Sequence, residues 1–193
     1  MTTPSFIVTA IREHPKRRGR FTIEVDGEDS AVVGLDSIAD LRLTVGEPVD
    51  DRSRRRLAVA NRRTALLDKA LNLLAVRARS SRDMRLRLRR APSDDRDIRW
   101  VIDRLGALGY VDDAAYARQV ARTRIVGGGT SKRRVQDELY RRGIPREVAS
   151  AAIEAVLAEG ALDEYGAALV AARKRLPSLS KLDAPTRRRR LYA

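Results

Sequence analysis

Cysteine is absent from the 193-residue sequence, and histidine occurs once, as His14. Without cysteine the chain can form neither disulfides nor Cys-ligated zinc or iron–sulfur sites. A single histidine, which lies just before the basic run at 16–18, also argues against histidine-rich metal sites and a Ser-His-Asp triad. We therefore expect a protein that binds no metal and no cofactor.

Long apolar segments are missing as well. No run approaches the ~18 residues that a membrane-spanning helix needs, and the N-terminus lacks the apolar core of a signal peptide. Aromatic residues make up 4% of the chain, whereas hydrophobic residues reach 43%. A core so poor in aromatics depends on Leu, Val, Ile and Ala, which suits packed helices. The sequence predicts a cytoplasmic, helical protein that does not contact a membrane.

Positive charge is abundant and unevenly distributed. Lys and Arg number 40 against 26 Asp and Glu, which gives a net charge of +14, and 35 of the 40 bases are arginine. The segments 52–90, 118–142 and 173–193 are basic, and the segments between them are acidic. Such an excess predicts an anionic partner, and its alternation suggests a repeating unit.

The sequence repeats itself at a spacing of 51 residues. Glycine, aspartate, serine and apolar positions coincide at this shift. The coinciding pairs are Gly109 and Gly160, Asp112 and Asp163, Ile102 and Ile153, Leu105 and Val156, Met84 and Val135, Leu88 and Leu139, and Ser80 and Ser131. Apolar residues at helical spacing predict three helices in each unit, over 64–78, 81–90 and 95–108 in the first.

The predicted fold class is mostly α, with tandem three-helix repeats in an elongated array and a small β-rich N-terminal module. The array would stack its units side by side, as repeat proteins do. The expected domains are the β-rich module at 1–50, a basic linker or helix at 51–63, a first repeat at 64–111, a second at 112–162 and a partial third at 163–193. Because the third unit stops at Ala193, we expect it to be incomplete.

Capping residues mark the predicted helix boundaries. Small polar residues at helix starts accept hydrogen bonds from free backbone N–H groups. Glycines at helix ends adopt the left-handed conformation that terminates a helix. The predicted N-caps are Ser80, Asp94 or Asp95, Asp112 and Ser131, and the predicted terminating glycines are Gly109, Gly143 and Gly160.

The N-terminal segment carries strand signals instead. Apolar and polar residues alternate from Arg20 to Asp26, and the following Asp26-Gly27 pair is a hairpin turn signal. The predicted elements are strands at 6–11, 20–26, 30–33 and 42–45 and a short helix at 36–41.

Catalytic and cofactor motifs are weak in this chain. Gly127, Gly128 and Gly129 precede Thr130-Ser131-Lys132, but this segment lacks the spacing of a phosphate-binding loop and follows a helix rather than a strand. The acidic pair at 112–113 is explained by helix capping. The sequence offers no nucleophile with an adjacent base, so we expect no catalytic residues.

The second helix of each unit is the strongest candidate for a binding site. Its arginines and lysines gather on one face, and arginine suits bidentate contact with phosphate or carboxylate. A solvated face held by salt bridges is the alternative interpretation. The candidate contact residues are Arg77, Arg79, Arg82, Arg85, Arg89, Lys132, Arg133, Arg134, Arg141 and Arg142.

The stretch 69–165 resembles the RecX family, the regulators of the RecA recombinase. The most specific piece is Leu-Gly-Tyr-Val-Asp-Asp at 108–113. The resemblance is also carried by 69–74, Arg77, 80–88, Leu105 to Ala107, Tyr116-Ala117 and 139–144, and by 19–27 near the N-terminus. Two departures are the segment 93–97, which replaces the family's glycine-hydrophobic turn, and the incomplete third unit.

The resemblance implies a regulator that is not an enzyme. Family members consist of tandem three-helix units, bind in the groove of the RecA–single-stranded-DNA filament, and inhibit its ATPase, strand-exchange and coprotease activities. We expect the RecA filament and single-stranded DNA as partners, with double-stranded DNA as a further option, and a monomeric chain. Two alternatives stay open: a DNA-binding transcription regulator, and an adaptor that binds only protein.

Overall fold

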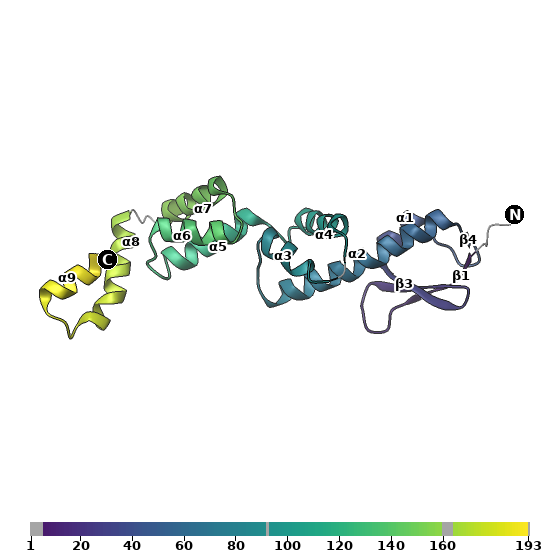
Figure 1. Ribbon diagram of the computed structural model, residues 1–193, viewed down its shortest axis with the longest axis horizontal. Coiled ribbons are helices and arrows are strands. Elements are labelled where there is room, and N and C mark those ends of the chain that lie inside the picture. Colours follow the sequence, from purple (N-terminus) through teal and green to yellow (C-terminus); the bar gives the residue numbers. More distant parts are fainter. Residues whose placement is uncertain (1–5, 92, 160–163, 193) are drawn as a thin grey trace. The chain divides into compact units, whose positions relative to one another are not determined.

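The computed structural model describes residues 6–91, 93–159 and 164–192, in which helices predominate and a small sheet lies near the N-terminus (Figure 1). This confirms the predicted fold class, a mostly helical chain with a β-rich N-terminal module. The chain divides into two compact units. The first holds the described residues up to Arg77 together with Arg85–Ala107, and the second holds Ala78–Met84 and the described residues from Leu108 onward.

The sheet of the first unit has four antiparallel strands in the order β3-β2-β1-β4. Asp26 and Gly27 form the β2–β3 turn with φ of +52° and +84°, the positive values that a tight type I′ hairpin requires. The predicted hairpin is therefore confirmed. The strands are β1 (Phe6–Glu13), β2 (Arg20–Val25), β3 (Glu28–Gly34) and β4 (Pro48–Val49).

The strand predicted at 42–45 is wrong, because the last strand is β4. Arg42 instead ends helix α1 (Leu35–Leu41) in the left-handed conformation, with φ of +50°. Its N–H donates to the carbonyl oxygen of Ala39, at 3.1 Å. A sequence pattern alone could not reveal a non-glycine residue in this conformation, since side chains disfavour it.

Helix α2 (Asp51–Val76) is much longer than the helix predicted at 64–78. Asp50 caps it by accepting a hydrogen bond from the N–H of Ser53, at 2.7 Å. The basic segment 51–63 is thus the first half of a continuous helix rather than a linker. Its Leu57 joins the buried cluster of the sheet, which includes Val8, Ile23, Val33 and Val49.

Helix α4 (Asp95–Ala107) lies against α2 in the first unit. Four residues of its predicted apolar stripe are buried, Ile98, Val101, Ile102 and Leu105, whereas the fifth, Leu108, lies after the helix end and is exposed. The carboxylate of Asp94 accepts from the N–H of Arg96 at 2.8 Å, so Asp94 fulfils the predicted cap. Helix α3 (Ser81–Leu88) is divided between the units after Met84.

The second unit packs helices α5 (Asp113–Ile125), α6 (Lys132–Arg141) and α7 (Arg146–Glu159) around one apolar cluster. Asp112 caps α5 as predicted, accepting from the N–H groups of Ala114 and Ala115. Ser131 precedes α6, but its side chain makes no capping hydrogen bond, contrary to our prediction. The cluster consists of Ala117, Ala121, Ile125, Val135, Leu139, Ile144, Ala149, Ala152, Ile153, Val156 and Leu157.

The C-terminal elements are α8 (Glu164–Arg175), a short 3-10 helix η1 (Leu176–Leu179) and α9 (Ala184–Tyr192). Helix α8 ends two residues before Pro177, which lies in η1. The predicted glycine cap at Gly160 and the repeat start at Asp163 lie outside the described residues. The division into these five domains stays a prediction. Within the described part of the chain, no helix is both long and apolar enough to cross a membrane.

Candidate functional site

Helix α3 presents arginines on one side and buries apolar residues on the other. Met84 and Leu88 are fully buried, while Arg82, Arg85 and Arg89 are exposed, as the helical spacing predicts. The hydroxyl of Ser80 accepts from the N–H of Asp83 at 3.2 Å, which confirms the predicted cap. The faces of this helix are therefore separated as a binding surface would require.

Two arginines of this region are already engaged by carboxylates. Arg79 is buried, and its Nη1 lies 2.8 Å from an oxygen of Asp83. Arg89 is exposed and donates from Nε and Nη2 to the two oxygens of Asp95, at 3.0 and 3.1 Å. This hydrogen-bonded pair lowers the pKa of Asp95 and raises the pKa of Arg89. Burial removes Arg79 from the surface that a partner could reach.

Helix α6 repeats the arrangement of α3. Val135 and Leu139 are buried, and Lys132, Arg133, Arg134 and Arg141 are exposed. The left-handed Gly143, with φ of +83°, follows the helix and packs tightly against Arg82. A Cβ at Gly143 would lie only 2.1 Å from the Cδ of Arg82. Within the second unit, Arg82 therefore lies close to the C-terminal end of α6.

Arg142 belongs to a half-buried network instead of the exposed face. It donates to the hydroxyl of Tyr116 and to the carboxylate of Glu138, which also accepts from Arg124 at 3.0 Å. Burial would raise the pKa of Glu138, but the hydrogen bonds and charges of Arg124 and Arg142 outweigh it and lower that pKa. Burial likewise opposes the charge of Arg142, yet Tyr116 and Glu138 raise its pKa.

Six of the ten predicted contact residues remain exposed and uncommitted. Their side chains make no hydrogen bond or ion pair with another residue in the described part of the chain. Guanidinium groups in this state keep all their donors for an outside acceptor. These six are Arg77 and Arg85 in the first unit and Arg82, Arg133, Arg134 and Arg141 in the second.

A buried carboxylate in the first unit was not among the predicted site residues. Asp97 on α4 is 3% exposed, and its two oxygens accept from the Nε atoms of Arg63 and Arg62, at 2.9 and 3.1 Å. A signal was present, because Asp97 lies four and eight residues before the buried Val101 and Leu105, on the same helix face. A charge on an apolar face needs partners, which α2 supplies here.

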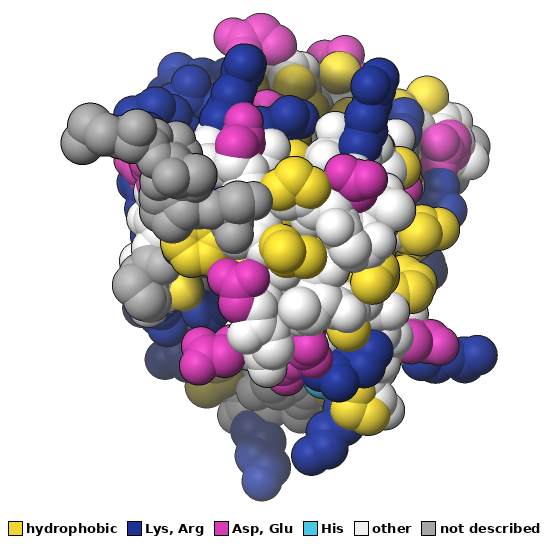
Figure 2. Space-filling view, turned by 90° about the vertical axis from the view of Figure 1, so that its right-hand side faces the viewer, with side chains coloured by type: hydrophobic (Ala, Val, Ile, Leu, Met, Phe, Trp, Pro, Cys, Tyr) yellow, Lys and Arg dark blue, Asp and Glu magenta, His cyan; other side chains and the backbone are white. Residues whose placement is uncertain are grey.

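Acidic and basic side chains are intermingled elsewhere on the surface. On the face drawn in the space-filling view, Asp and Glu side chains lie among those of Lys and Arg (Figure 2). This face of the molecule is therefore not uniformly basic. In the ranges that the structure describes, no group of three or more His, Cys, Asp or Glu side chains could hold a metal ion.

Comparisons with known proteins give the family. Models of the first and second three-helix domains of RecX match residues 67–105 and 112–153. Regulatory protein RecX of Amycolatopsis mediterranei is 37% identical over 120 residues, which cover 62% of this chain and 67% of that protein. The chain belongs to the RecX family of regulatory proteins.

More distant RecX proteins extend the match. Regulatory protein RecX of Listeria welshimeri is 25% identical over 156 residues, which cover 81% of this chain but 58% of the Listeria protein. A crystal structure of regulatory protein RecX superimposes with a TM-score of 0.76 at 20% identity, over 96% of this chain and 90% of that chain. RecX from Lactobacillus salivarius has a TM-score of 0.58 at 19% identity, covering 68% and 84%. These structures share the fold.

All ten predicted contact residues fall within the two matched RecX domains. The first domain includes those of α3 and its preceding segment, and the second includes those of α6. The segment 93–97 also lies in the first domain and contains the buried Asp97.

Proposed function

We propose that this chain is a non-enzymatic regulator that binds the RecA–single-stranded-DNA filament and inhibits its ATPase, strand-exchange and coprotease activities. Through RecA it would modulate DNA repair and the SOS response. The observation that carries the proposal is the set of exposed, uncommitted arginines on α3 and α6, in a chain that belongs to the RecX family.

The chemistry of these arginines suits a phosphate-rich partner. A guanidinium group binds phosphate through two parallel N–H donors, and neutralising phosphates releases counterions. Arg133, Arg134 and Arg141 extend from one helix whose other face is fixed by Val135 and Leu139. Because that helix is anchored, binding orders the arginine side chains but not the backbone that carries them. Carboxylates on the RecA surface would be recognised by the same groups.

The proposal assigns no catalysis to this chain. Most carboxylates near the basic helices already serve as caps or ion-pair partners, as Asp112, Asp95 and Glu138 do. We propose that the chain acts as a monomer in the cytoplasm and controls a reaction performed by RecA.

The direct test is RecA ATPase activity on single-stranded DNA, measured with and without this chain. ATP turnover should fall as the chain is added, while the chain alone hydrolyses nothing. Unchanged RecA turnover at saturating concentrations would contradict the proposal. Base-specific protection of duplex DNA would instead indicate a transcription regulator, and salt-insensitive binding to protein alone would indicate an adaptor.

A further inference from the structure

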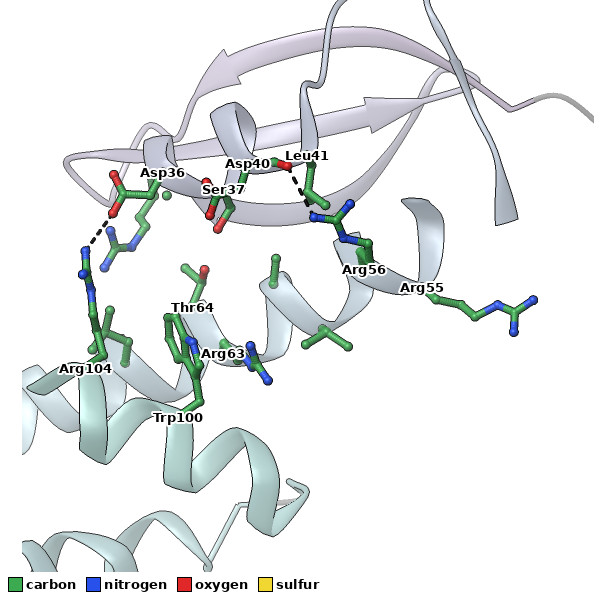
Figure 3. A pocket seen from close by; sticks show the side chains of 15 residues that line it. Asp36, Ser37, Asp40, Leu41, Arg55, Arg56, Arg63, Thr64, Trp100 and Arg104 are labelled. Carbon is green, nitrogen blue, oxygen red and sulfur yellow. Dashed lines mark hydrogen bonds and ion pairs between the residues drawn. The ribbon is translucent and has the colours of Figure 1, made fainter. Parts of the chain in front are cut away.

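The first unit contains a pocket of about 460 Å³, which is lined by none of the ten predicted contact residues. It opens between α1, with the end of β3, and the facing sides of α2 and α4 (Figure 3). The volume lies within the range of small-ligand sites in proteins. Its lining is rich in arginine and also includes Trp100, the only tryptophan of the chain.

Most arginines in the pocket have been partly neutralised by neighbours. Arg104 pairs with Asp36 at 2.9 Å, and Arg20 pairs with Asp68 at 2.6 Å. Arg63 uses its Nε on Asp97 and leaves the donors of both its Nη atoms for other partners. These pairs hold the walls in place without using every donor.

Arg56 is the least committed arginine that points across the pocket. Its side chain donates a single hydrogen bond, from Nη2 to the carbonyl oxygen of Asp40, at 3.4 Å. Figure 3 shows Arg56 directed toward α1, whereas the neighbouring Arg55 points away from Asp40 and Leu41. A guanidinium carries five N–H donors, so Arg56 keeps most of its capacity for an anion.

Trp100 supplies a flat apolar wall. Trp100 is 39% exposed, although tryptophan is highly buried on average. The guanidinium of Arg63 lies over the indole, 4.9 Å from the ring centroid. Val59 and Leu67 of α2 add apolar lining nearby. An exposed indole beside arginines is the combination that stacks a base and holds its phosphate.

We propose that this pocket binds a nucleoside phosphate, with the base against Trp100 and the phosphate on Arg56 and Arg63. This inference does not rest on the proposed function, since the pocket lies in the first unit and involves none of the ten predicted contact residues. The same chemistry has two sources, a free mononucleotide or one nucleotide of a single-stranded DNA. An acidic peptide offers the charge but no base.

The test uses the fluorescence of Trp100 in the full chain, because no other residue contributes indole emission. Adenosine monophosphate and oligo(dT) are titrated in separate arms, with excitation at the red edge of the indole band. We expect saturable quenching in at least one arm. Quenching by the mononucleotide indicates a free ligand, and quenching by oligo(dT) alone indicates single-stranded DNA.

Two variants establish where the signal comes from. Arg56→Ala should lower the affinity for the ligand that quenches the fluorescence by at least about tenfold, as expected when a charge-assisted hydrogen bond is lost. Arg118→Ala on α5 removes the same charge at an exposed residue that lies outside both the pocket and the ten predicted contact residues, and it should leave the affinity for the quenching ligand unchanged. Trp100→Phe should abolish the signal while binding persists in calorimetry.

Three results would overturn the proposal. The first is no quenching by either ligand at millimolar concentration. The second is equal loss of affinity for the quenching ligand in Arg56→Ala and Arg118→Ala, which would indicate general charge attraction. The third is stronger quenching by poly-glutamate than by either nucleic-acid ligand, which would indicate an acidic peptide. Circular dichroism of each variant confirms that the helices remain folded.

Discussion

Helices α4 and α7 occupy equivalent places in the 51-residue repeat, but at one equivalent position they bury side chains of different kinds. Asp97 of α4 is buried and bound by Arg62 and Arg63 of α2. At the corresponding position of α7, Val148 packs against the apolar cluster of the second unit. Neighbouring register positions are apolar and buried on both helices, as with Ile102 and Ile153. Equivalent positions of the two helices are thus packed inward in both units, while one contact is ionic in the first unit and apolar in the second.

This difference separates two uses of arginine. In the first unit, the long N-terminal half of α2 places arginines against Asp97 and around the pocket, where they hold helices together. In the second unit, the apolar cluster holds the helices, and the arginines of α6 remain exposed. In the second unit, substituting the arginines of α6 therefore tests binding without removing contacts that hold the helices together.

The largest expected effect comes from removing the buried carboxylate. Asp97→Ala should lower the free energy of unfolding by about 2–3 kcal/mol, because it leaves the partly exposed guanidinium groups of Arg62 and Arg63 without their shared partner. Val148→Ala should cost only about 1 kcal/mol, since Val148 is half-buried and loses two methyl groups. Denaturant unfolding followed by circular dichroism measures both. Equal costs would show that the ionic contact contributes no more than apolar packing.

A smaller effect is expected from the glycines with positive φ. Gly143→Ala should cost about 2 kcal/mol, because the new Cβ adds a clash with Arg82 to the strain of a left-handed alanine. Gly109→Ala is the matched control, with φ of +72° and no atom within 4 Å of the added Cβ. It should cost about 1 kcal/mol. Identical melting temperatures for the two variants would contradict the described packing of Arg82.

The smallest effect concerns Glu138 and depends on pH. The folded chain lowers the pKa of Glu138 from its ordinary value of 4.5, so its carboxylate stabilises the fold above that value. This contribution is lost as pH falls through the lowered pKa. Glu138→Gln should therefore cost about 1 kcal/mol at neutral pH and progressively less below pH 4.5. A cost that stays constant down to low pH would contradict the ion-pair network.

Local patterns predicted much of the fold. The alternation in β2 and the Asp26-Gly27 pair specified the hairpin, because a tight turn requires residues that accept positive φ. Asp112 and Ser80 specified helix starts, since a cap depends on residues three positions away at most. The spacing of Met84 and Leu88 identified the exposed face of α3 correctly.

Long-range partners could not be predicted in the same way. Arg62 and Arg63 lie 35 and 34 residues from Asp97, so nothing local marks them as structural. The segment 51–63 was left open as a linker or a helix, because six arginines within 52–63 hide the apolar positions that contact the sheet. Arg79 was assigned to the binding face, although its burial beside Asp83 makes it part of the structure.

The central claim is that the exposed, uncommitted arginines of the second unit bind the filament, whereas paired arginines of the same unit do not. The most direct measurement is affinity for RecA–single-stranded-DNA filaments as a function of salt concentration. Two double variants are compared. The first combines Arg133→Gln with Arg141→Gln, and the second combines Arg122→Gln with Arg124→Gln. The second pair is the matched control, because Arg122 and Arg124 bind Glu159 and Glu138.

The account predicts weaker binding for the first double variant, with the slope of log affinity against log salt flatter by about 0.7 for each lost single-strand phosphate contact. The control variant should bind with a slope close to that of the parent chain. Equal losses in the two variants, or parental binding by both at every salt concentration, would contradict the claim.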